Sequence, residues 1–285
     1  MLYSSISPNF QWEYHSHDTT RPGSSYGTIV TAAGSSHTKG SYTGIVTTPT
    51  AYDTYMIWIN INSGTQSAVN NQGLMDIAID PAGGTSYTEL IIPDLYVTNA
   101  GNYNTIGSGG IYYIFPLFIP AGATIAARVQ SKTASRTYRV NMRLMGLPTN
   151  PEMVRFGTKV EALGVDSASS AGTLITMGTT SEGAWTSIAS PTYDTWWWQI
   201  GYGAADTSTS SVTYHLDVGV GDATNKKIVV KDFPVFVSGV EEQYTLPFAV
   251  GAYGIGTPSD TVYARGQSSG AVDSNTSVIV YALSG

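Results

Sequence analysis

The chain has 285 residues, about the length of two average domains, with 13 basic and 20 acidic residues and a formal net charge of −7. Charged residues make up 12 % of it, against roughly a quarter in ordinary soluble domains, so Ser, Thr, Asn, Gln and Gly supply most of its polarity. The absence of cysteine excludes disulfides and thiolate metal sites. The acidic balance, without a run of basic residues, argues against nucleic acid as a partner.

The chain begins with a segment, Met1 to Thr20, that we expect to form an N-terminal arm without a counterpart in the second half and without order in the isolated protein. It lacks the basic and apolar regions of a signal peptide. No apolar run is long enough to span a bilayer, so we expect no membrane insertion.

The arm carries one candidate metal motif, His15-Ser16-His17-Asp18, preceded by Glu13. Imidazoles at alternate positions of an extended strand could face one metal ion. No later motif completes a coordination shell, so an exposed polar arm is the better interpretation, and we expect neither a metal nor another cofactor.

Short β-branched and aromatic runs separated by Gly, Pro, Asn and Ser predict strands along the whole chain, and helix signals are scarce. In the first half we expect strands at 27–32, 44–47, 55–61, 74–79, 89–92, 111–115, 124–130 and 136–144. In the second half we expect them at 159–164, 174–179, 186–189, 196–200, 212–220, 227–230, 244–248, 261–267 and 276–283. Between the halves, Pro148-Thr149-Asn150-Pro151 marks a boundary, because two prolines within four residues interrupt a β-ladder.

The second half repeats the first. The clearest matches are Pro49 to Ile59 with Pro191 to Ile200, Asp76 to Ile79 with Asp217 to Val220, Leu90 to Leu95 with Ile228 to Phe233, Ala127 to Ser131 with Ala264 to Ser268, and Val140 to Gly146 with Ile279 to Gly285. The spacing between the matched residues drifts by only a few positions, as short loop insertions and deletions produce.

Roughly eight strands in each copy, without helical crossovers, predict an all-β protein of two tandem β-sandwich (jelly-roll-like) domains that arose by internal duplication. We expect an arm at 1–25, a first domain at 26–148 and a second domain at 149–285. The short linker predicts that the two domains hold a fixed relation.

One segment carries a family resemblance: Phe115-Pro116-Leu117-Phe118-Ile119-Pro120-Ala121-Gly122-Ala123-Thr124-Ile125-Ala126-Ala127-Arg128-Val129-Gln130-Ser131. It resembles a segment of virion structural proteins of tailed bacteriophages. Its Pro-Ala-Gly triplet suits a turn that leads into a strand. The second copy keeps Leu246-Pro247-Phe248 and Ala264 to Ser268 but replaces the triplet by a longer loop. The resemblance implies a particle component of the head or the tail.

The most conspicuous partner- or glycan-binding candidates are Trp196, Trp197, Trp198 and the nearby Tyr193. In a regular strand Trp196 and Trp198 share one face and Trp197 takes the other. The matching residues of the first copy, Tyr55 to Ile57, are all apolar or aromatic. This match favours packing in a core or an interface over stacking on a sugar.

No catalytic constellation stands out, so we do not expect an enzyme. Gly23 to Gly27 has the spacing of a hydrolase nucleophile elbow but lacks the strand before it and the helix after it. Asp53 and Asp76 recur as Asp194 and Asp217, in contexts that suit hydrogen bonding to the backbone.

The sequence therefore predicts a non-enzymatic virion structural protein of a tailed phage, most simply a capsid decoration or accessory surface protein. Its expected partners are further copies of itself, in a homo-oligomer, and the major capsid or tail protein of the same particle. We expect it in the virion, after synthesis in the host cytoplasm. The alternative is a receptor- or glycan-binding module of a tail fibre or baseplate that binds a host surface glycan.

Overall fold

The computed structural model describes residues 11–16, 27–63, 72–97, 111–147, 156–204, 212–237, 252–269 and 276–285. This part of the chain is all-β, without a helix, as the sequence predicted. It therefore contains no helix that could cross a membrane. The expected domain boundaries after residues 25 and 148, the proline-rich linker and the expected strand 244–248 lie outside the described residues.

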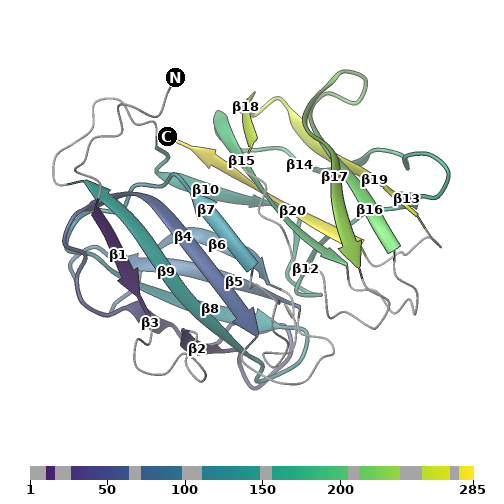
Figure 1. The fold of residues 1–285 in the computed structure, drawn as a ribbon. Helices are drawn as coiled ribbons and strands as arrows, with labels where there is room; N and C mark the ends of the chain where they lie inside the picture. Colours follow the sequence, from purple (N-terminus) through teal and green to yellow (C-terminus); the bar gives the residue numbers. More distant parts are fainter. Residues whose placement is uncertain are drawn as a thin grey trace.

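The first β-sandwich is built from two facing sheets (Figure 1). One has the order β1-β9-β4-β7, with β2 also on β9, and the other has the order β3-β8-β5-β6. Its strands are β1 (Gln11–His15), β2 (Thr28–Thr31), β3 (Thr43–Val46), β4 (Asp53–Ser63), β5 (Gly73–Asp80), β6 (Glu89–Val97), β7 (Ile111–Phe115), β8 (Thr124–Ser131) and β9 (Thr137–Leu147). This order of antiparallel strands in two sheets is that of a jelly roll.

The second β-sandwich repeats this arrangement. One sheet has the order β11-β12-β20-β15-β18, with β10 on β20, and the other has the order β13-β19-β16-β17, with β14 on β19. Its strands are β10 (Lys159–Leu163), β11 (Val165–Asp166), β12 (Ala171–Leu174), β13 (Met177–Gly178), β14 (Thr186–Ala189), β15 (Thr195–Ala204), β16 (Val212–Gly221), β17 (Lys226–Val237), β18 (Ala252–Gly256), β19 (Thr261–Ser268) and β20 (Thr276–Ser284). The single strand expected at 174–179 is two short ones, because the chain crosses there from β20 to β19.

Part of the expected arm is a strand of the first sandwich, so the prediction of an arm without a counterpart is wrong for Gln11–His15. β1 pairs with the end of β9 as β10 pairs with the end of β20. Glu13 on β1 accepts a hydrogen bond from the amide of Ala51, and Glu161 on β10 accepts one from the amide of Thr192. A sequence comparison misses this match because β1 and β10 share little more than the glutamate.

The pairing of β4 and that of β15 are irregular at the same position of the repeat, although against different partner strands. The register of β4 against β9 shifts at Tyr55, and the register of β15 against β18 shifts at Trp196. Beyond this irregularity Ile57 opposes Leu144 and Trp198 opposes Ala282. Because Ile57 and Trp198 are equivalent, Leu144 is equivalent to Ala282. The structure therefore shifts the sequence match of Val140 to Gly146 with Ile279 to Gly285 by one residue.

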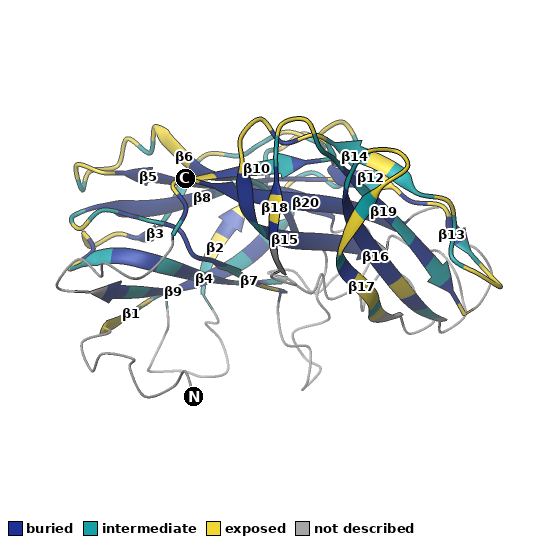
Figure 2. Ribbon diagram, turned by 90° about the horizontal axis from the view of Figure 1, so that it is seen from above, coloured by how far each residue is buried: buried dark blue, intermediate teal, exposed yellow. Residues whose placement is uncertain are grey.

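The strands are largely buried and many connecting loops are exposed (Figure 2), and most of the buried side chains are apolar. Strand alternation explains the two cores: Val278, Val280 and Ala282 face the core of the second domain. Their neighbours Ile279, Tyr281 and Leu283 face the other way and join the core of the first domain. One face of the second domain is thus buried against the first.

This interface places a sheet face against a sandwich end. The outer face of β10, β15 and β20 packs on β6 and β7, the neighbouring edge strands of the first domain (Figure 1). Uncovered edges offer unpaired backbone groups to other chains. The second domain covers this end of the first, so the two domains form one packed unit, as the short linker predicted.

Tyr281 is the central side chain of the interface. Its hydroxyl accepts a hydrogen bond from the amide of Tyr96 at 2.6 Å and donates one to the carbonyl of Asp94 at 2.9 Å. Its ring packs edge-on against Tyr113 and Phe115. Burial raises the pKa of Tyr281 well above that of a free phenol, so the hydroxyl keeps the proton that it donates.

Candidate functional site

The irregularity at Trp196 separates the three tryptophans. Trp198 is fully buried in the core of the second domain, whereas Trp196 belongs to the core shared with the first domain. Trp197 is partly buried and packs against that same core. The expectation that Trp196 and Trp198 share one face is therefore wrong, because the side-chain alternation breaks where the pairing of β15 is irregular, between Thr195 and Trp197.

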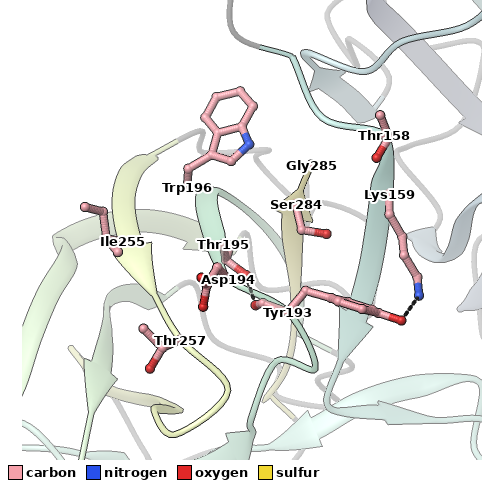
Figure 3. A pocket seen from close by; sticks show the side chains of 10 residues that line it. All are labelled: Thr158, Lys159, Tyr193, Asp194, Thr195, Trp196, Ile255, Thr257, Ser284 and Gly285. Atoms are coloured by element: carbon pink, nitrogen blue, oxygen red, sulfur yellow. Dashed lines mark hydrogen bonds between the residues drawn. The ribbon is translucent and has the colours of Figure 1, made fainter.

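Tyr193 and Trp196 line a hollow of about 600 Å³ at one end of the second domain (Figure 3). Tyr193 is 44 % exposed and Ile255 is 73 % exposed. The ammonium of Lys159 donates a hydrogen bond to the Tyr193 hydroxyl at 2.9 Å. The remaining lining residues are Thr158, Asp194, Thr195, Thr257, Ser284 and Gly285.

The corresponding place in the first domain is filled. Thr54 forms a β-bridge with Ile119, and the equivalent Thr195 pairs with Gly256. Ile119 is therefore equivalent to Gly256, and the preceding residues, Phe118 and Ile255, are equivalent too. Phe156 packs at 5.0 Å from the Tyr55 ring and 5.5 Å from the Phe118 ring. In the second domain, Trp196 and Ile255 line the hollow at this place.

The hollow combines an apolar wall, formed by Trp196 and Ile255, with the polar groups of Lys159 and Asp194. Such a mixture suits a planar ring with a polar edge, either an aromatic side chain of a protein or a sugar. Of the four predicted binding residues, Tyr193 is exposed, Trp196 borders the hollow but is only 4 % exposed, and Trp198 is fully buried.

Three of the four predicted carboxylates, those of Asp53, Asp76 and Asp217, hydrogen-bond to the backbone or form ion pairs, and Asp194 lines the hollow. Asp53 accepts the amide of Ala121. Asp76 accepts the amide of Asp94 and pairs with Arg128 at 2.9 Å and with Lys39 at 2.7 Å. This buried carboxylate is fully engaged in structural contacts.

The second domain repeats this cluster with one reversal of charge. Asp217 accepts the amide of Asp232 and pairs with Arg265. Glu182 takes the place of the lysine and also pairs with Arg265. Burial, followed by the negative charge of Asp217, raises the pKa of Glu182. Carboxylate oxygens of Glu182, Asp217 and Asp232 lie within 4.8 Å of one another, the spacing of a possible metal site, but Arg265 already pairs with two of the three.

A second surface was not predicted from the sequence. The outward side chains of β1, β4, β7 and β9 form what we call the outer face of the first domain: Trp12, Tyr14, Trp58, Tyr112 and Arg143. Arg143 lies 5.6 Å from the Tyr14 ring and 5.3 Å from the Trp58 ring. The alternation of Trp12 and Tyr14 was the available signal, but it lay within the expected arm.

The fold and these surfaces define a two-domain all-β sandwich protein with aromatic side chains open to solvent. Neither a family model nor a curated protein matches its sequence.

Three solved structures are similar over most of this chain. PNGase F, a glycosylasparaginase from Flavobacterium meningosepticum, is 10 % identical over 97 % of this chain and 96 % of its own, with a TM-score of 0.42. PNGF-II is 12 % identical over 97 % of this chain and 65 % of its own, with a TM-score of 0.39. A chain of Sulfolobus turreted icosahedral virus is 10 % identical over 96 % of this chain and 90 % of its own, with a TM-score of 0.35. At these TM-scores we draw no conclusion from the likeness.

Proposed function

We propose that this protein is a non-enzymatic structural protein of a virus particle, in the narrowest form a capsid decoration or accessory surface protein of a tailed phage. The observation that carries the proposal is the outer face of the first domain. Trp12, Tyr14 and Tyr112 are 42 %, 58 % and 41 % exposed, and Arg143 on the same face lies 5.6 Å from the Tyr14 ring. Trp, Tyr and Arg are the residues that dominate binding energy in protein interfaces.

The low content of charged residues in the chain also suits a role in assembly. A chain with 12 % charged residues has few ions to desolvate when a partner covers it. The proposed partners are other copies of the chain and the major capsid or tail protein of the particle, and the proposed location is the virion.

The copy number of the protein per purified particle tests this function. Quantitative mass spectrometry against the major capsid protein should give hundreds of copies for a decoration protein. A few to a few dozen copies would move it to the tail, and absence from particles would contradict the proposal.

The hollow beside Trp196 favours a second candidate, a receptor- or glycan-binding module of a tail fibre or baseplate. Tyr193 is the residue to change, because it is exposed and its loss leaves the core intact. Tyr193→Ala should abolish binding to glycans or host cells without a change in folding. Retained binding would contradict this candidate.

A further inference from the structure

We propose that the outer face of the first domain binds the edge strand β17 in the second domain of another copy, head to tail. The inference rests on the proposed structural function and names the partner of that face. Its template is the interface inside the chain, where the outer face of the second domain covers the β6 and β7 end of the first.

The internal repeat locates the equivalent groups. Arg143 opposes Trp58 on β4, and Tyr281 opposes Gln199 on β15, so Arg143 holds the position of Tyr281. On the edge strands, Tyr96 opposes Leu74 and Pro234 opposes His215. Pro234 therefore holds the position of Tyr96, and Asp232 holds that of Asp94.

Both members of the equivalent contact have changed in a matched way. Tyr281 accepts a hydrogen bond from the amide of Tyr96 and donates one to Asp94. Arg143 can only donate, and Pro234 has no amide hydrogen to donate. What remains on β17 is an acceptor, the carbonyl of Asp232, together with its carboxylate. An arginine opposite an aspartate completes the contact with a charge-assisted hydrogen bond.

Both surfaces are open in the described part of the chain. Pro234 is exposed, and the side chain of Asp232 is 55 % exposed. Asp94 and Asp232 share a left-handed backbone, with φ of 48° and 51°, so the two edges present their carbonyl groups from the same local conformation. On the other side Tyr14 and Trp58 hold the guanidinium of Arg143 between their rings.

The interface joins two different surfaces, so it is heterologous. Such contacts build a closed ring when the rotation between neighbours divides a full turn, and a filament otherwise. Each copy would then use both ends, with a first domain that binds one neighbour and a second domain that binds the other.

Charge reversal of the full-length chain tests the contact. Arg143→Glu and Asp232→Arg should each raise the dissociation constant for self-association more than tenfold, measured by sedimentation equilibrium. Lys132→Glu, a change of the same charge on an exposed loop of the first domain, should leave it unchanged. Thermal unfolding of each variant checks that the fold is retained.

Mixing the two variants distinguishes this arrangement from nonspecific effects. When the two variants alternate, each contact pairs either the natural arginine with the natural aspartate or the introduced glutamate with the introduced arginine. The mixture should therefore associate, whereas each variant alone should not. Failure of the mixture to associate would overturn the proposal.

A cross-link gives a second measurement that tolerates small changes in stability. The chain has no cysteine, so Arg143→Cys mixed with Asp232→Cys should form a disulfide between two copies, and Lys132→Cys with Asp232→Cys should not. A wild-type chain that stays monomeric at every soluble concentration, without this cross-link, would contradict the head-to-tail contact. The copy number in particles would still decide the proposed function separately.

Discussion

Lys39 and Glu182 occupy the same position in the two domains and carry opposite charges. Each precedes a glycine whose amide donates a hydrogen bond to the neighbouring strand, at 2.9 Å in both copies. Each also lies against an aspartate–arginine pair, Asp76 with Arg128 or Asp217 with Arg265. The first cluster is balanced, with two carboxylates and two cations, whereas the second sets three carboxylates against Arg265 and the exposed Lys231, which lies 3.9 Å from Asp232.

The lysine should therefore stabilise the first domain. Lys39→Met removes the ammonium that binds Asp76 and Asp94 and leaves a buried carboxylate with one cationic partner. We expect a loss of about 2 kcal/mol in the free energy of unfolding, measured with urea. Lys132→Met, at an exposed position, should change it by less than about 0.5 kcal/mol. Equal effects of the two changes would show that the cluster does not stabilise the domain.

The glutamate should have the opposite effect. The pKa of Glu182 is raised in the folded protein, so folding favours its protonated form. Its contribution to stability is present below the unfolded pKa and is lost as the pH rises through the folded pKa. Glu182→Gln should therefore gain stability relative to the wild type as the pH rises, by up to about 1 kcal/mol at neutral pH.

A pH series of urea unfolding curves, from about pH 4 to pH 8, measures this difference. Glu89→Gln, on the exposed end of β6, removes the same charge and serves as the control. A difference between Glu182→Gln and the wild type that does not change with pH would contradict the role given to Glu182.

The Tyr281 hydroxyl should stabilise the contact between the domains. Tyr281→Phe keeps the ring but leaves the amide of Tyr96 and the carbonyl of Asp94 without this partner. Because buried polar groups without partners are costly, we expect a loss of about 1 to 3 kcal/mol. Tyr263→Phe, on β19 and away from the interface, should have little effect. If both variants unfold alike, the Tyr281 hydrogen bonds do not matter for stability.

Gly203 lies against the ring of Tyr96, and a Cβ atom there would overlap that ring. Gly203→Ala should therefore push the domains apart and cost about 1 to 3 kcal/mol, as overpacking does. Gly34→Ala is the matched control, since no atom lies within 4 Å of its added Cβ. Thermal unfolding compares the two, and a stable Gly203→Ala variant would show that Tyr96 can move aside.

Replacing a buried aromatic residue near the hollow should reduce the free energy of unfolding much more than replacing an exposed one. Trp198→Ala should cost about 3 to 5 kcal/mol, because the indole is fully buried. Tyr193→Ala should cost less than about 1 kcal/mol. Urea unfolding followed by circular dichroism measures both, and a small loss for Trp198→Ala would mean that this core is loosely packed.

Local patterns located most strands because each is a short β-branched or aromatic run between turn residues. The expected strands at 111–115 and 186–189 match β7 and β14 to the residue. The features that the sequence did not predict depend on contacts between distant parts of the chain. β1 pairs with a partner more than a hundred residues away, and the irregularity at Trp196 depends on the neighbouring strands, so neither is visible in a local window.

The sequence by itself determined the class and the repeat. Alternating apolar residues and conserved spacings within one chain require two similar β-sandwiches, because side-chain alternation depends only on neighbouring residues. The tertiary structure alone decided which faces are buried. The same sheet face carries Tyr281 in one domain and Arg143 in the other, and only the packing of the domains shows that the first is covered and the second is open to a partner.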